Sequence, residues 1–77
     1  MQIKGKFIES YKTDWTSDLV KTFNHTLNSS DILVSLWGIT DNLQYFPDEV
    51  EILDVNSISI TVSEIPTGGL RVVVLGL

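Results

Sequence analysis

The sequence predicts an all-β protein, a small antiparallel β-sandwich of six to seven strands, on the basis of three observations. The chain of 77 residues contains no alanine, which is the strongest helix former. It contains 8 Ile, 8 Val and 7 Thr, whose branched side chains suit strands. Short alternating segments are separated by turn residues about every 8–12 positions, which is typical of sandwiches and small barrels. The expected strands are residues 2–11, 19–27, 32–37, 43–46, 49–52, 58–62 and 70–77.

The first two strands are expected from loose alternation of apolar and polar side chains. Residues 2–11 place Ile3, Phe7 and Tyr11 on one face, opposite Lys4, Lys6 and Ser10. A polar connection with one tryptophan, Trp15, follows at residues 13–18. Residues 19–27 then place Leu19, Phe23, His25 and Leu27 at period two. A helix over residues 16–23 is the alternative here, because Leu19, Val20 and Phe23 also fit helical spacing.

The middle strands are bounded by clear turn residues. Residues 28–31, Asn-Ser-Ser-Asp, can hydrogen-bond their own backbone in a turn. Residues 32–37 are apolar on both faces except Ser35, which predicts a central strand. After a turn at 38–42, residues 43–46 form a short strand that ends at Pro47, because proline belongs at a strand end or edge. Residues 49–52 alternate acidic and apolar side chains.

The last two strands give the strongest signals. Ile58, Ile60 and Val62 alternate with polar residues, which predicts a half-buried strand. Residues 70–77 are apolar on both faces: Val72 and Val74 are expected to face the core, which leaves Val73, Leu75 and Leu77 on the other side. Such a strand is either central in the fold or covered by another subunit. The second possibility makes Val73, Leu75 and Leu77 candidates for an oligomer interface.

Composition limits the possible partners. The length allows one domain, residues 1–77, whose core is small enough that oligomerisation often assists stability. Zero Cys excludes disulfides and thiolate metal sites. Residues 1–21 sum to +1 and residues 22–77 to −6, without the basic face of a nucleic-acid binder. No apolar run has the ~18–20 residues of a membrane span, and the first residues lack a signal-peptide core.

Catalytic chemistry is not expected. His25 is the only histidine, and no nucleophile-elbow motif accompanies the serines. We expect His25 to cap an apolar face with one hydrogen-bonded nitrogen. The acidic group Asp48, Glu49, Glu51 and Asp54 lacks a calcium-loop pattern, so a solvated strand face is expected. The sequence predicts no enzyme, no metal site and no cofactor.

Aromatic residues are the candidates for ligand or partner contact. Trp15 lies in the polar connection, where an exposed indole could stack on a sugar ring or anchor a partner; the alternative is that it packs within the fold. Trp37 and Tyr45 flank the turn at 38–42 and are expected side by side across a hairpin, either as a structural cross-strand pair or as a contact surface.

The order of short motifs along the chain resembles a known family. These motifs are Asp14-Trp15, then residues 25–34 (His-x-Leu-Asn-Ser-Ser-Asp-Ile-Leu-Val), 47–52 (Pro-Asp-x-Val-x-Ile), 54–62 (Asp-x-Asn-Ser-Ile-x-Ile-Thr-Val) and 69–74 (Gly-x-Arg-Val-Val-Val). Together they cover most of residues 14–76 and resemble a small β-sandwich module of tailed-bacteriophage virion proteins, found in fibre tips and capsid-associated proteins. Thr26 stands where that module usually has asparagine, and residues 38–46 lack its simple glycine turn.

The resemblance implies a homotrimer with a structural or adhesive role on the virion surface, produced in the host cytoplasm. A capsid decoration, cement or head-associated protein is the leading expectation, with the major capsid protein or another virion protein as partner. The alternative is a tail-fibre tip or lectin-like domain that binds host carbohydrate, since the motifs also resemble, more distantly, trimeric H-type lectin sandwiches. No nucleic-acid or membrane partner is expected.

Overall fold

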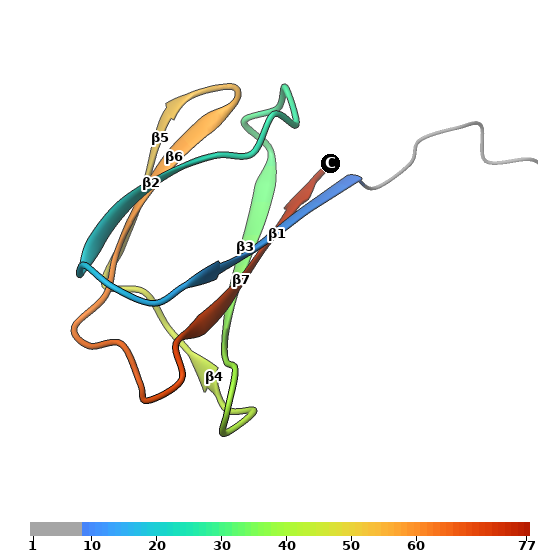
Figure 1. Cartoon of the computed structure of the whole chain (residues 1–77). Helices are drawn as coiled ribbons and strands as arrows, with labels where there is room; N and C mark the ends of the chain where they lie inside the picture. Colours follow the sequence, from blue (N-terminus) through green and yellow to red (C-terminus); the bar gives the residue numbers. More distant parts are fainter. Residues whose placement is uncertain (1–8) are drawn as a thin grey trace, which may run out of the picture.

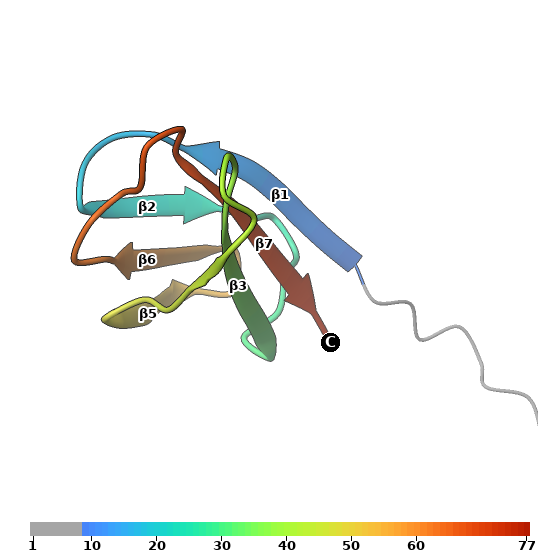
Figure 2. The same ribbon diagram turned by 90° about the horizontal axis from the view of Figure 1, so that it is seen from below.

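The computed structural model describes residues 9–77 and contains seven strands in two antiparallel sheets (Figure 1). The strands are β1 (Glu9–Trp15), β2 (Val20–Asn24), β3 (Ile32–Gly38), β4 (Gln44–Tyr45), β5 (Glu49–Asp54), β6 (Ser57–Thr61) and β7 (Leu70–Gly76). One sheet has the order β1-β7-β3-β4 and the other β2-β6-β5. Figure 2 shows that the strands of the two layers cross at an angle. The predicted antiparallel sandwich is confirmed.

The core lies between the two sheets and is built from alternate residues of the central strands. Leu36 of β3 and Val72 and Val74 of β7 are fully buried, as are Ile58 and Ile60 of β6. Because side chains alternate across a strand, the residues between them point to the outer faces. The predicted inward positions of β6 and β7 are therefore confirmed.

The predicted strands agree with the structure in number and order, but their boundaries differ. The prediction for residues 2–8 lies outside the described residues. Residues 13–15 continue β1 instead of forming a loop, in register with residues 70–72 of β7. β2 ends at Asn24, and positive φ angles at Thr26 (57°) and Asn28 (53°) turn the chain beyond it. The alternative helix over 16–23 is wrong, because β2 pairs with β6 there.

β7 is central in its sheet, between β1 and β3. The register places Val74 between Tyr11 and Val34, which makes this row part of the inner face. Both predicted explanations of a strand that is apolar on two faces therefore still apply. The second sheet covers the inner row, whereas within residues 9–77 no further sheet covers the outer row.

Candidate functional site

A network of backbone bonds, here called the loop clasp, joins the β2–β3 loop to the β5–β6 turn. The amide of His25 donates to the Asn56 carbonyl (2.8 Å), and the amide of Asn28 donates to Asn56 Oδ1 (2.7 Å). The amide of Ser29 donates to the Val55 carbonyl (2.8 Å). Most of these residues belong to the motifs that carry the virion-module resemblance. Their observed role is to hold two loops of the sandwich together.

His25 lies inside this region and is 1% exposed. Its Nδ1 accepts a hydrogen bond from the amide of Leu27 (3.1 Å), while its buried Nε2 has no hydrogen-bond partner in the described chain. The expectation that this histidine caps an apolar face with one bonded nitrogen is confirmed. The contacts give it a structural role.

The tautomer of His25 follows from this geometry. A nitrogen that accepts a hydrogen bond carries no proton, so the neutral ring is expected to be the Nε2–H form. Nitrogen-15 NMR, at a pH where the ring is neutral, should show a protonated Nε2 and an unprotonated Nδ1. The opposite tautomer would contradict the observed bond from Leu27.

Trp15 is buried, with 1% of its surface exposed, at the end of β1. Its indole N–H donates to the carbonyls of Ser17 (2.7 Å) and Asp18 (2.8 Å). Its ring meets Phe23 edge to face, with centroids 5.3 Å apart. Of the two alternatives for Trp15, packing within the fold is observed, and the exposed indole in a polar loop is not. The neighbouring polar residues satisfy the buried N–H, and no ring face is available to a sugar.

Trp37 and Tyr45 do not lie side by side. In the β3–β4 pair, Trp37 stands opposite Gln44, and Tyr45 stands opposite Leu36. Because Leu36 is fully buried, Tyr45 lies on the core side and Trp37 on the outer side of the same sheet. The predicted pairing is wrong by one residue of register, which is enough to place the two rings on opposite faces.

The outer face of the four-stranded sheet carries an apolar group, here called the outer patch: Leu33, Trp37, Val73 and Leu75. Leu33 and Leu75 stand directly opposite one another, and Leu33 is 57% exposed. Val73 and Leu75 are half-buried, and Leu77, just beyond the strand, is exposed. Two of the three predicted interface residues thus belong to the outer patch, and Leu77 continues their row. Lys12 and Arg71 border it across from Val73 and Trp37.

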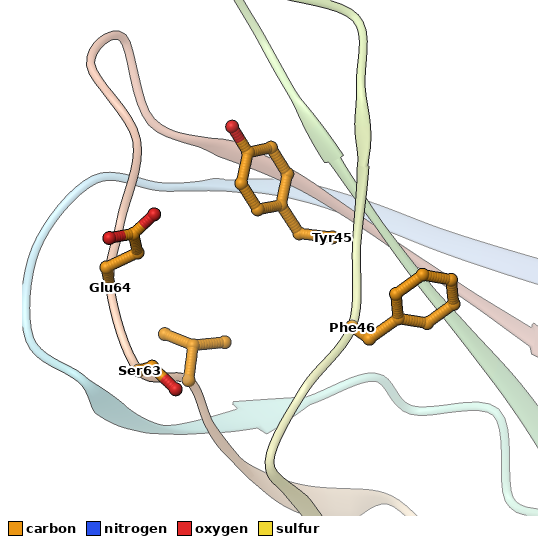
Figure 3. A pocket seen from close by; sticks show the side chains of 5 residues that line it. Tyr45, Phe46, Ser63 and Glu64 are labelled. Carbon is orange, nitrogen blue, oxygen red and sulfur yellow. The ribbon is translucent and has the colours of Figure 1, made fainter.

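A pocket of about 200 Å³ opens between β4 and the β6–β7 loop, lined by Tyr45, Phe46, Val62, Ser63 and Glu64 (Figure 3). Phe46 is 77% exposed, and its ring is directed away from Ser63 and Glu64. Sequence reasoning included Tyr45 but missed Ser63 and Glu64. No motif identifies these two, because a loop distant in sequence brings them to the aromatic residues.

A hydrogen bond beside the pocket fixes its tyrosine. The Tyr45 hydroxyl donates to Asp41, and the amide of Leu43 donates to the other oxygen of that carboxylate (2.9 Å). The Tyr45 bond, followed by the Leu43 bond, lowers the pKa of Asp41. The same bond raises the pKa of Tyr45, because the neighbouring carboxylate favours the neutral phenol.

Tyr45→Phe is expected to raise the pKa of Asp41 towards its ordinary value, because the largest cause of its lowering is removed. The pKa of Asp41 is depressed in the folded state, so the stabilisation it supplies is present at neutral pH. It is lost as the pH falls through the lowered pKa. Carbon-13 NMR titration of the Asp41 carboxyl measures the change. Tyr11→Phe is the matched control and should leave that titration unaltered.

The described residues contain neither a metal-binding cluster nor a helix that could span a membrane. No group of three or more His, Cys, Asp or Glu side chains among residues 9–77 could hold a metal ion. Glu49 and Glu51 are exposed on β5, opposite Thr61 and Ser59 of β6, as expected for a solvated strand face. In this same part of the chain there is no helix with the length and apolar character that a bilayer crossing requires.

The geometry therefore offers two surfaces, the outer patch and the pocket at Tyr45. Comparisons with protein-family models, curated proteins and solved structures found no match to this chain.

Proposed function

We propose that this chain is a non-enzymatic structural protein of a bacteriophage virion, an oligomeric capsid decoration, cement or head-associated protein. The observation that carries the proposal is the outer patch on the four-stranded sheet. Leu33 and Leu75 face each other there, with Val73 and Trp37 alongside. Adjacent apolar side chains on an outer face are typical of surfaces that are buried by a partner.

The loop clasp also supports this proposal, because it contains residues that carry the resemblance to the virion module. The residues that resemble the virion module, such as His25, Asn28 and Asn56, make structural hydrogen bonds. They account for how 77 residues without disulfides hold long connections in place. A small module of this kind gains further stability when copies assemble. The proposed assembly is a homotrimer, in which each outer patch meets a neighbouring copy or the major capsid protein.

The assembly part of the proposal is tested by light scattering on the purified chain at micromolar concentration. The expected mass is three times the 8.6 kDa of the chain. A monomer at that concentration would exclude the trimer.

The virion part needs a separate test. The chain is expected to co-sediment with expanded capsid shells of the phage whose genome encodes it, and to bind unexpanded shells less. Leu75→Lys is the matched variant, because it alters the outer patch and leaves the inner face unchanged. Absence of wild-type binding to expanded shells would contradict a decoration role.

The pocket favours a second candidate function, that of a tail-fibre tip or lectin-like domain that binds host carbohydrate. It combines the ring of Tyr45 with the hydroxyl of Ser63 and the carboxylate of Glu64, and the exposed Phe46 lies at its rim. Aromatic rings stack on apolar sugar faces, and a few polar groups fix orientation. Its volume of about 200 Å³ is below the ~300–1,000 Å³ of most small-molecule sites and suits a single ring.

A glycan array with the wild-type chain tests this candidate. Binding that is lost in Phe46→Ala and kept in Leu43→Ala, an exposed residue of the preceding loop, would support it. An array without a hit would exclude it.

A further inference from the structure

Strand β5 is an edge strand with an incompletely covered face. It pairs with β6 on one side only, and all six of its residues are exposed. Val50 and Ile52 stand opposite the fully buried Ile60 and Ile58, so they point to the core side, yet they are 38% and 46% exposed. An exposed edge with an apolar row is a template for pairing with a further strand.

The two faces of β5 differ in charge. Glu49 and Glu51 alternate with Val50 and Ile52 and occupy the outer face. No salt bridge from Lys12, Lys21 or Arg71 to these carboxylates is present within residues 9–77. A strand that adds to this edge is therefore favoured if it carries apolar side chains on one face and cations on the other.

The N-terminal sequence has this complementary pattern. Ile3, Gly5 and Phe7 alternate with Lys4 and Lys6. Since side chains repeat at every second residue of a strand, a register that sets Lys4 and Lys6 opposite Glu49 and Glu51 places Gly5 beside Val50 and either Ile3 or Phe7 beside Ile52. The match of two lysines to two glutamates holds for either strand direction.

The same chain cannot supply this strand to its own β5. β1 begins at Glu9 on the outer edge of the four-stranded sheet, and its neighbour across the core is β2, as the contact of Trp15 with Phe23 shows. β5 is the far edge of the β2-β6-β5 sheet, ~10 Å from β2. With residues 3–7 on β5, only Ile8 would remain to reach Glu9, and one residue spans about 3.5 Å. Figure 2 shows β1 and β5 on opposite sides of β7 and β3.

We propose that residues 3–7 of one copy add as a strand to β5 of a second copy, with Lys4 and Lys6 against Glu49 and Glu51. Each copy gives one segment and accepts one, so the exchange is either reciprocal within a dimer or runs head to tail and closes into a ring if the rotation between copies permits. This contact uses a different surface from the outer patch and does not depend on a virion role.

Charge reversal in the full-length chain tests the pairing. Lys4→Glu/Lys6→Glu and, separately, Glu49→Lys/Glu51→Lys are each expected to weaken self-association at least tenfold in sedimentation velocity at low salt. An equimolar mixture of the two variants should restore it, because each segment then meets an oppositely charged β5. Glu49 and Glu51 are exposed, and circular dichroism checks that folding is retained in each variant. Unchanged association in both variants, or no recovery in the mixture, would overturn the proposal.

Disulfide cross-linking identifies the segment that pairs with β5. Because the chain has no native cysteine, only the introduced cysteines can form disulfides. Lys6→Cys/Glu49→Cys and Lys6→Cys/Glu51→Cys, oxidised as mixtures of nitrogen-14 and nitrogen-15 chains, are expected to form disulfides between copies in at least one variant. The faster of the two gives the strand direction. Lys6→Cys/Lys21→Cys is the control, since Lys21 is on the opposite edge strand β2. Disulfides within one chain, or equally fast cross-linking in the control, would overturn the proposal.

Discussion

Trp15→Ala is expected to remove about 3–5 kcal/mol of folding free energy, the usual loss when a large buried aromatic residue is truncated. The indole is 1% exposed and packs edge to face on Phe23. Its loss also leaves the carbonyls of Ser17 and Asp18 without their shared donor. A domain of this length has a total stability of ~4–12 kcal/mol. The variant is therefore expected to be largely unfolded or to lose more than about 12 °C in melting temperature.

Trp37→Ala is the matched control for this prediction. The chain has two tryptophans, and Trp37 lies on the outer face instead of in the core. Because Trp37 belongs to the outer patch, the two variants are compared by urea denaturation at a chain concentration at which the wild type is monomeric. The replacement of Trp37 should then change the stability by about 1 kcal/mol or less. It also leaves Trp15 as the only indole, whose fluorescence should be that of a buried ring. Equal losses in the two variants would show that the burial of Trp15 does not determine stability.

The strands of this fold could be predicted because most of them show a local sequence pattern of alternating or apolar residues next to turn residues. Ile58 and Ile60 alternate with polar residues, and the strand that contains Val72 and Val74 follows the turn residues 66–69. Burial of one face requires this alternation, so the inward residues could be identified without a structure. The extent of β1 could not, because its polar second half is a strand only through its pairing with β7.

The candidate site was less predictable because it depends on register and on distant loops. Trp37 and Tyr45 flank the same turn, and a shift of one residue decides whether their rings share a face. Trp15 is surrounded by polar residues in sequence, yet their backbone carbonyls make its burial possible. The pocket needs Ser63 and Glu64 from the β6–β7 loop. The register and the pocket depend on contacts between separate segments, and the burial of Trp15 depends on the backbone conformation of the residues that follow it.

The outer patch and the β5 edge belong to different sheets of the sandwich. The patch lies on the outer face of the β1-β7-β3-β4 sheet, and the edge belongs to the β2-β6-β5 sheet. A copy that uses both surfaces contacts its neighbours through side chains on one sheet and through backbone bonds on the other. Salt isolates the charge contribution at the β5 edge, because screening weakens the lysine–glutamate pairs and not the apolar contacts of either surface.

Leu75→Lys is expected to weaken self-association by about 30-fold or more. Leu75 stands between Leu33 and Ser10 on the outer face of β7. A charged side chain there would be buried without a partner in the proposed assembly, and hot-spot losses are about 2 kcal/mol or more, which corresponds to the 30-fold change. The side chain does not enter the core, so the isolated monomer should unfold at nearly the same urea concentration as the wild type.

Leu43→Lys is the matched control, because it places the same charge at a 61% exposed leucine of the β3–β4 loop, outside the outer patch. Sedimentation equilibrium of both variants in high salt removes the lysine–glutamate contribution at β5, which is then screened, and leaves the apolar contacts. Dissociation by Leu75→Lys alone assigns the interface to the outer patch. Equal association in both variants would mean that copies meet elsewhere, and the half-buried state of Val73 and Leu75 would then reflect only their central place between β1 and β3.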